Sequence, residues 1–139
     1  ELDALIEKNA GKSIPEIFEQ DGEIAFRSLE IEATKEVAGR KNTVIACGGG
    51  IVLNKINIDR LKQECVIVYL KASPSVILRR VSQSDSERPL LKVANPDLTA
   101  RELLRFRKPF YERAADITID TSKLDVDSVV AEIVSRLRG

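Results

Sequence analysis

The sequence contains no histidine, and only two of its 139 residues are cysteine. The absence of histidine excludes histidine general bases, Ser-His-Asp triads and most zinc sites. Two cysteines cannot build a disulfide framework. Cys47 and Cys65 each lie in an apolar run, which favours a buried and unreactive thiol. We therefore expect a reducing, cytoplasmic setting.

Long apolar runs and an overall charge are also missing. No apolar stretch approaches the roughly 18 residues that a membrane-spanning helix needs, and no signal-peptide pattern is present. Basic and acidic residues number 22 each, so there is no general positive field to attract nucleic acid. The segment from Arg79 to Arg113 nevertheless carries nine basic and five acidic residues. This local excess suits a small anionic ligand.

Helical and strand-like patterns alternate along the chain. They predict an α/β fold in which helices cover both faces of a parallel sheet, within a single domain over 1–139. The polar segment 84–97 is predicted to be a loop, and Pro109 is expected to kink or break its helix. Strands are predicted over 43–47, 65–70 and 117–120, and helices over 4–9, 23–39, 56–63, 73–82, 98–115 and 126–138, with a further helix between Ser13 and Asp21.

Gly11-Lys12-Ser13 resembles the end of a phosphate-binding P-loop, but the rest of that motif is missing. The first glycine of Gly-x-x-x-x-Gly-Lys-[Ser/Thr] would fall at Ile6, and no strand precedes the segment. We interpret Gly11 as the C-cap of one helix and Ser13 as the N-cap of the next.

Gly48-Gly49-Gly50 follows the predicted strand 43–47. Glycines can take positive φ and let a ligand approach bare backbone N–H groups, and the carboxyl end of a strand is where ligands bind in α/β sheets. These two properties predict a binding loop. The alternative is a flexible turn.

Charged and aromatic side chains can be placed around this loop. Asp3 could accept a hydrogen bond from a substrate hydroxyl or act as its base. Glu30 lies three residues after Arg27 on one predicted helix, so it could orient the guanidinium. Two arginines with the Gly49 amide would hold a carboxylate firmly, which suggests a small polyhydroxylated acid as ligand. A surface salt bridge and ordinary core packing are the alternatives.

The motifs of the chain resemble those of the shikimate kinase family, in the same order and with similar spacing over essentially its whole length. The matching motifs are Asp3, Ser13-Ile14-Pro15-Glu16-Ile17-Phe18, Asp21-Gly22-Glu23-x-x-Phe26-Arg27-x-x-Glu30, Gly48-Gly49-Gly50, Arg88-Pro89-Leu90-Leu91 and Arg107-x-Pro109-x-Tyr111. The resemblance implies a three-layer α/β/α fold of the P-loop kinase type. It also implies transfer of the ATP γ-phosphoryl group to the 3-hydroxyl of shikimate, with Mg²⁺, in the biosynthesis of aromatic amino acids.

The same resemblance implies which residues contact shikimate. Asp3 would hold and polarise its hydroxyls, and Arg27 and Arg107 would grip its carboxylate. Glu30 would orient Arg27 from behind. The complete set of implied shikimate-binding residues is Asp3, Phe18, Phe26, Arg27, Gly48, Gly49, Gly50 and Arg107.

On the nucleotide side, the resemblance implies a lid over about 84–97 that carries Arg88 toward the transferring phosphate. Arg80 would stack near the adenine, and Thr121 and Ser122 would border the same pocket. Glu1 stands where the family has the first aspartate of Asp-x-Asp, and its longer carboxylate could reach Mg²⁺ through water.

The family's first strand, its P-loop and the following helix have no counterpart in this sequence. We expect about 30 residues, one strand–loop–helix unit, together with the second strand, to precede Glu1, and we expect kinase activity only when the P-loop segment is supplied. The central strand of the sheet would then be absent from this chain. A monomer that binds neither nucleic acid nor a membrane is expected. The alternatives are a non-catalytic shikimate-binding fragment or regulatory remnant, and a gluconate kinase-like enzyme, against which Arg27, Arg107 and the triple glycine argue.

Overall fold

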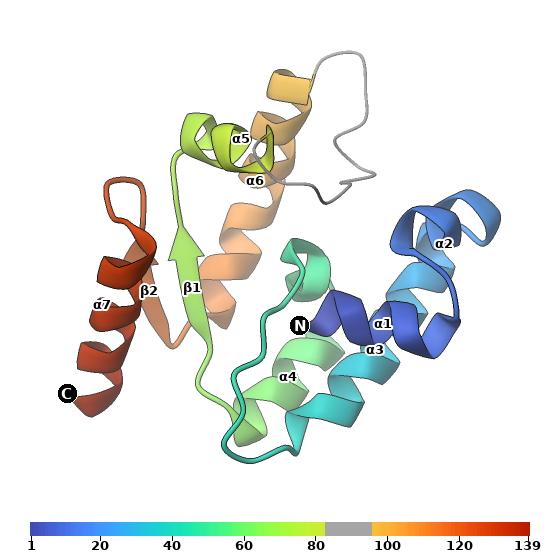
Figure 1. Ribbon diagram of the computed structural model, residues 1–139, viewed down its shortest axis with the longest axis horizontal. Helices are drawn as coiled ribbons and strands as arrows, with labels where there is room; N and C mark the ends of the chain where they lie inside the picture. The colour runs from blue at the N-terminus through green and yellow to red at the C-terminus, as the bar shows by residue number, and fades with distance from the viewer. Residues whose placement is uncertain (83–95) are drawn as a thin grey trace. The chain divides into compact units, whose positions relative to one another are not determined.

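The computed structural model describes residues 1–82 and 96–139, which divide into two units, Glu1–Cys65 and Val66–Gly139 (Figure 1). In the first unit, α3 packs against α1, α2 and α4. The elements of this unit are α1 (Leu2–Ala10), α2 (Ile14–Gln20), α3 (Glu23–Ala38), the 3-10 helix η1 (Gly49–Leu53) and α4 (Lys55–Glu64). Its core residues are Leu2, Ile6, Ile17, Phe26, Ala33, Val37, Ala38, Ile51, Val52 and Leu61.

Local capping signals set the turns between the first three helices. Gly11 ends α1 in the left-handed region, at φ 72°, which glycine adopts without a steric penalty. Ser13 caps α2 through a capping box in which its side chain accepts from the backbone N–H of Glu16. Lys12 forms an ion pair with Asp21, the residue that ends α2. The interpretation of Gly11-Lys12-Ser13 as a turn between helices is therefore confirmed.

The strand predicted over 43–47 is wrong. The structure describes this segment and assigns it neither helix nor strand, and Val44 is fully open to solvent. Its Ala46 carbonyl accepts a hydrogen bond from the Leu2 N–H at 2.9 Å. A strand needs a neighbour to pair its backbone N–H and C=O groups, so an apolar, β-prone sequence is not sufficient by itself.

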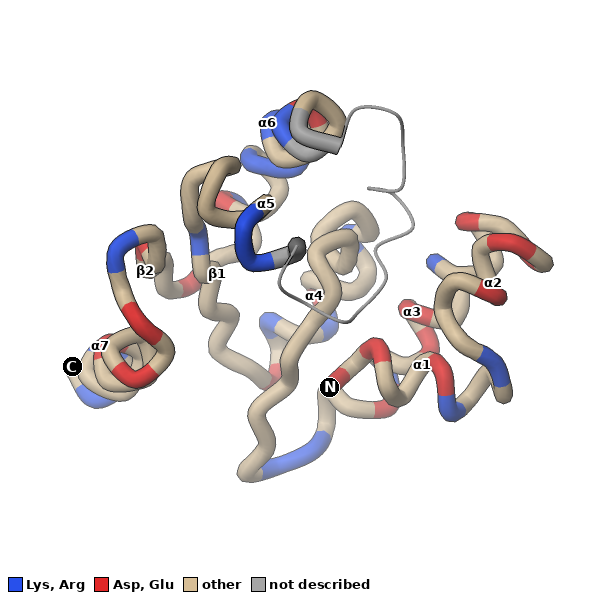
Figure 2. The backbone as a smooth tube through the Cα atoms, turned by 45° about the horizontal axis from the view of Figure 1, so that its top comes forward, with Lys and Arg blue, Asp and Glu red and all other residues tan. Residues whose placement is uncertain are grey.

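The second unit contains a two-stranded parallel sheet of β1 (Val68–Lys71) and β2 (Ile117–Asp120). The register pairs Val68 with Ile117 and Lys71 with Asp120. The helices of this unit are α5 (Pro74–Ser82), α6 (Pro96–Ala114) and α7 (Val126–Arg138). Figures 1 and 2 place α6 and α7 on opposite faces of the sheet, as predicted for an α/β unit.

Three details of the second unit differ from the sequence predictions. β1 begins at Val68, three residues later than expected, and the Ile67 carbonyl before it accepts hydrogen bonds from the N–H groups of Asp116 and Ile117. Two apolar residues of the predicted strand 65–70, Val66 and Leu70, are exposed. α6 continues through Pro109 without ending there.

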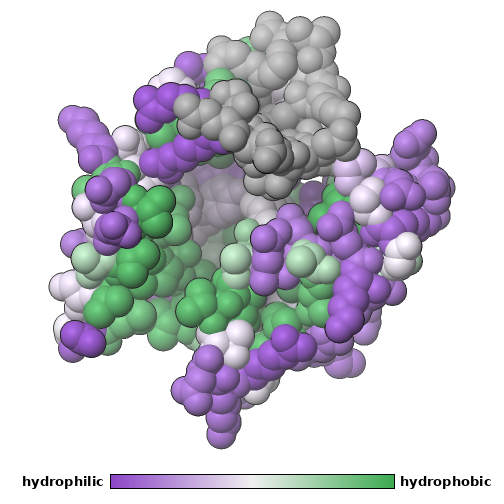
Figure 3. Space-filling view, in the orientation of Figure 1, coloured by the Kyte–Doolittle hydropathy of each residue, from purple (hydrophilic) through white to green (hydrophobic). Residues whose placement is uncertain are grey.

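α7 turns much apolar surface outward. Val126, Val130, Val134 and Leu137 are all exposed, and apolar side chains gather over this helix in Figure 3. Within the described part of the chain, no helix is both long and apolar enough to cross a membrane.

Candidate active site

Arg27 is held by a buried carboxylate on its own helix. Its Nη1 lies 3.1 Å from Oε1 of Glu30, one turn along α3, and Glu30 is only 1% exposed. The Arg27 side chain is 15% exposed, and its Nε also lies 3.8 Å from Oε2 of Glu23. The predicted i,i+3 pair is therefore confirmed, and a surface salt bridge is excluded. A buried carboxylate that fixes a guanidinium gives the site a preoriented cation.

Two phenylalanines pack beside this arginine. The rings of Phe18 from α2 and Phe26 from α3 lie 4.8 Å apart between centroids, and the Arg27 guanidinium lies 5.2 Å from the centroid of Phe26. The cation thus faces an aromatic ring on one side. An apolar wall next to a fixed cation suits a ring-shaped acid.

Gly48 and Gly50 lack room for a side chain, because other side chains already occupy the space that a Cβ would need. A Cβ on Gly50 would lie 2.7 Å from Cζ of Arg27, and a Cβ on Gly48 would lie 3.1 Å from Oδ1 of Asp3. The expectation of positive φ is wrong, since only Gly11 and Gly22 have positive φ among the described glycines. The side chains of Asp3 and Arg27 instead explain two of the glycines, because they lie where a Cβ would be.

Asp3 reaches this loop from the start of α1. The hydrogen bond from Leu2 N–H to the Ala46 carbonyl ties the beginning of α1 to the segment that precedes the glycines. Asp3 lies in the first turn of this helix, where a carboxylate is favoured by the helix dipole. Asp3, the glycine loop and Arg27 are therefore neighbours within the first unit.

Cys47 immediately precedes the glycine loop, and the pKa of its thiol is shifted by nearby groups. Loss of hydration around the thiol, reinforced by the charges of Glu30 and Asp3, raises the pKa of Cys47 to about 11. Both cysteines are free. The residue Cys47 is exposed and Cys65 is half-buried, so the expectation of buried thiols is wrong for Cys47, but a thiol that stays protonated at neutral pH remains a poor nucleophile.

Asn57 is a supporting residue that the sequence analysis missed. It is 1% exposed on α4, and its Nδ2 donates to the Ile51 carbonyl of η1 at 3.4 Å. Buried amides are costly unless they are hydrogen-bonded, so this contact ties the turn after the glycines to α4. The only signal in the sequence is a polar residue on an otherwise apolar helix face, which also fits a solvated position.

In the second unit, Arg80 forms two hydrogen bonds with Thr121, the residue that follows β2. Its Nη1 donates to Oγ1 of Thr121 at 2.9 Å and its Nη2 donates to the Thr121 carbonyl at 2.8 Å. Oγ1 of Thr121 donates in turn to the Lys71 carbonyl at 3.0 Å, and Oγ of Ser122 accepts from the Ser73 N–H at 3.0 Å. These residues lie at the carboxyl ends of two parallel strands, the edge where α/β sheets bind ligands.

Arg107 lies on α6 and is 8% exposed. Its Nε is buried and has no hydrogen-bond partner in the described structure. A buried cationic donor without a partner carries a desolvation penalty that a bound anion would remove. The role of Arg107 in ligand binding remains a prediction, with which an unpartnered buried donor is compatible.

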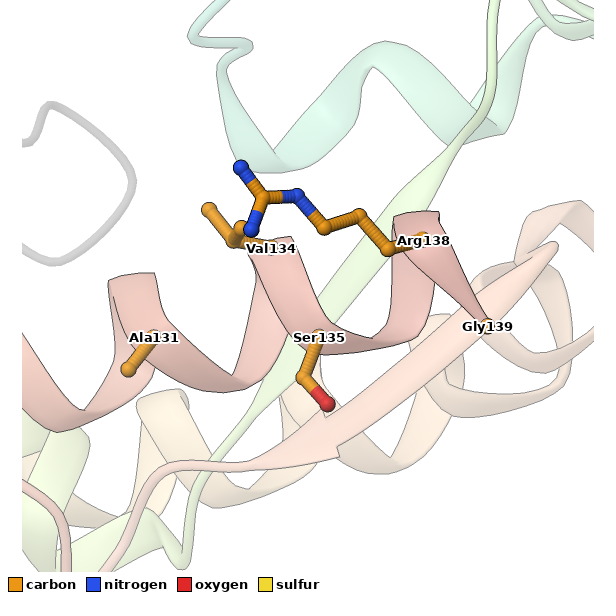
Figure 4. A pocket seen from close by; sticks show the side chains of 5 residues that line it. All are labelled: Ala131, Val134, Ser135, Arg138 and Gly139. Atoms are coloured by element: carbon orange, nitrogen blue, oxygen red, sulfur yellow. The ribbon is translucent and has the colours of Figure 1, made fainter.

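The remaining predicted residues fall outside these clusters. Arg88 and most of the predicted lid lie in 83–95, outside the described residues. Glu1 is an exposed residue that precedes α1, and residues 1–82 and 96–139 contain no cluster of three or more carboxylate or thiol side chains that could hold a metal ion. The depression on α7 in Figure 4 is formed by that helix and Gly139 alone and includes none of the predicted residues.

Comparison with known proteins identifies the family. The family model described as shikimate kinase matches residues 1–138. The shikimate kinase of Caldanaerobacter subterraneus subsp. tengcongensis is 49% identical over 134 residues, which cover 96% of this chain and 77% of that protein. The shikimate kinase of Thermoanaerobacter pseudethanolicus is 45% identical over the same shares.

Solved structures agree in fold. The shikimate kinase from Acinetobacter baumannii in complex with shikimate superposes with a TM-score of 0.92 at 37% identity, covering 98% of this chain and 75% of that one. The enzyme from Aquifex aeolicus gives a TM-score of 0.81 at 35% identity, over 99% and 79%. The fold is thus the α/β fold of the P-loop kinases, and this chain belongs to the shikimate kinase family, a family of ATP-dependent kinases.

Proposed function

We propose that this protein transfers the γ-phosphoryl group of ATP to the 3-hydroxyl of shikimate, giving shikimate 3-phosphate on the route to chorismate and the aromatic amino acids. The observation that carries the proposal is the buried Glu30–Arg27 pair in contact with Gly50, with Asp3 beside Gly48. The related enzyme from Acinetobacter baumannii was solved with shikimate bound. The gluconate kinase-like and non-catalytic alternatives find no support among the relatives.

Arg27 of the first unit binds the shikimate carboxylate, and the family resemblance assigns Arg107 to the same group. A guanidinium has five N–H donors, and in the described structure Glu30 lies 3.1 Å from Nη1 and Glu23 lies 3.8 Å from Nε of Arg27. The other donors of Arg27 are thus compatible with a bidentate carboxylate contact. Arg107 brings the unpartnered Nε, and the Gly49 amide contributes a further donor. Phe18 and Phe26 pack against the ring.

Asp3 orients the acceptor hydroxyl and accepts its proton as the oxygen attacks phosphorus. The Asp3 carboxylate lies against Gly48, where an added Cβ would be only 3.1 Å from its Oδ1. Arg88 stabilises the charge on the transferring phosphoryl group. Arg80, Thr121 and Ser122 border the nucleotide, and the two hydrogen bonds from Arg80 to Thr121 keep its planar guanidinium in one orientation for stacking.

Kinases of this family use ATP with Mg²⁺ as the usual metal ion. The described residues include no cluster that fits the ion. Glu1 offers a single exposed carboxylate, so no step of the mechanism is assigned to a metal held by these residues. The chain also remains predicted to be a cytoplasmic monomer.

The proposal is tested by shikimate binding and by phosphoryl transfer. We expect Arg27→Lys, which keeps the charge but loses the bidentate fork, to raise the shikimate Kd at least tenfold, about 1.4 kcal/mol. Arg40→Lys is the matched control, because Arg40 pairs with Glu36 on the exposed end of the same helix. Calorimetry measures binding, and mass spectrometry identifies the phosphorylated product formed with ATP.

Each result distinguishes the candidate functions. A Kd for Arg27→Lys within twofold of the parent protein would refute the carboxylate role. Binding of shikimate without product by the full-length protein would favour the non-catalytic alternative. Phosphorylation of gluconate in place of shikimate would favour the gluconate kinase-like alternative.

A further inference from the structure

Arg107 lies in the turn of α6 where Pro109 interrupts the helical hydrogen bonds. Pro109 has no N–H, so it cannot donate the helical hydrogen bond to the carbonyl of Arg105, four residues earlier. Arg107 lies midway between these two residues, and its own Nε has no partner. The backbone and the side chain therefore both lack a hydrogen bond that would fix the position of this guanidinium.

A pair of tyrosines supplies an anchor just beyond the proline. Tyr111 lies four residues after Arg107 and therefore on the same face of α6. Its ring stacks on Tyr69 of β1, with centroids 5.0 Å apart and an interplanar angle of 23°. The stack joins α6 to β1. In the parallel pairing of β1 with β2, Tyr69 lies opposite Thr118. Removal of water by packing raises the pKa of Tyr69, in agreement with a phenol held against protein.

The other aromatic pair of the helix cannot serve this purpose. Phe106 and Phe110 lie 5.6 Å apart between ring centroids, and both belong to α6 itself. Phe106 is 61% exposed. This pair therefore provides a matched comparison, an aromatic contact on the same helix that does not reach the sheet.

We propose that Tyr69 and Tyr111 are positioning residues that hold the Arg107 turn of α6 against the sheet, so that the guanidinium is set for the substrate carboxylate. This inference rests on the function proposed above. Neither tyrosine touches the substrate. Packing of the two rings compensates for the helical hydrogen bond that is missing at Pro109.

The first test compares substitutions of the stack with the matched control. Tyr69→Ala removes the ring, and we expect it to raise the shikimate Kd roughly fivefold, about 1 kcal/mol, as expected for an aromatic pair. Tyr69→Phe keeps the ring and should restore affinity to within twofold. Phe106→Ala should leave the Kd unchanged. An equal Kd for Tyr69→Ala and the parent protein would overturn the proposal.

A double-mutant cycle with Arg107→Ala separates this inference from the proposed function. If Tyr69 acts through Arg107, Tyr69→Ala has no further effect on affinity in the Arg107→Ala background. If Tyr69→Ala costs the same in both backgrounds, the positioning role is wrong while the proposed function stands. If Arg107→Ala alone leaves the Kd unchanged, the carboxylate role in the proposed function is wrong.

A spectroscopic measurement tests the proposal on the parent protein, without any substitution. The chain has two tyrosines and no tryptophan, so its near-ultraviolet circular dichroism in the tyrosine region comes from Tyr69 and Tyr111 alone. We expect shikimate to change this signal with the same Kd that calorimetry gives. A signal that stays flat while calorimetry shows saturation would overturn the coupling between the stack and the site.

Discussion

Gly50 offers the sharpest perturbation of the site, because a single added methyl group competes with Arg27 for space. A Cβ at position 50 would lie 2.7 Å from Cζ of Arg27, whereas ordinary contact begins at 3.4 Å. One of the two groups must therefore retreat by at least 0.7 Å. The backbone of η1 is held by the contact from Asn57 to Ile51, so we expect the flexible end of Arg27 to move.

The cost follows from what the guanidinium leaves behind. Arg27 and Glu30 are joined by a 3.1 Å contact between largely buried groups, and a hydrogen bond between charged groups contributes about 1.5–3 kcal/mol. We therefore expect Gly50→Ala to lower the free energy of unfolding by about 2 kcal/mol. Because the displaced arginine no longer faces the ligand, the shikimate Kd should rise at least tenfold, about 1.4 kcal/mol.

Two other glycines complete the comparison. Gly48→Ala brings a Cβ to 3.1 Å from Asp3, which a small movement of the carboxylate relieves, so its effect should be weaker. Gly39 has no atom within 4 Å of an added Cβ and has φ −88°, so Gly39→Ala should stabilise the protein by about 0.4–1 kcal/mol. Urea unfolding and calorimetric titration measure both quantities. If Gly50→Ala behaves like Gly39→Ala in both, close packing does not explain the glycine loop.

Two more predictions concern buried polar groups. Arg107→Met removes the unpartnered Nε, so thermal melts without ligand should show a more stable protein, by about 1 kcal/mol, while shikimate affinity falls more than tenfold; lower stability and unchanged affinity would contradict this reasoning. The pKa of Cys47 is raised from 9.0 to about 11, so the folded state favours the neutral thiol. Its contribution to stability is complete below pH 9 and is lost as the pH rises toward 11. Alkylation of Cys47 in a Cys65→Ser background should accelerate over that range, and half-maximal alkylation near pH 9 would contradict the shift.

Local signals in the sequence were sufficient for the helices and for one functional pair. Gly11 and Ser13 determine the turn between α1 and α2 through their own backbone and capping preferences. The spacing of Arg27 and Glu30 places them on one helix face whatever surrounds the helix. These features depend on residues within one or two turns, which is why the sequence predicts them well.

Features that depend on distant partners could not be predicted in this way. The segment 43–47 has a strand-like sequence, but a strand also needs a paired neighbour. Asn57 supports η1 and Tyr69 supports α6 through contacts that form only after the chain has folded. The glycine loop was recognised, but its cause, the volume of Asp3 and Arg27, belongs to segments more than twenty residues away.

Arg27 and Arg107 illustrate opposite solutions to the same physical problem. Burying a guanidinium costs several kcal/mol unless a partner compensates for the lost hydration. Arg27 receives its partner, Glu30, from the protein, so its cation is stable and preoriented before any ligand arrives. Arg107 keeps a buried donor without a partner, so part of its cost is recovered only when an anion binds. The first arrangement fixes the orientation of the cation before a ligand binds, and the second leaves a donor whose pairing with an anion would add to the free energy of binding.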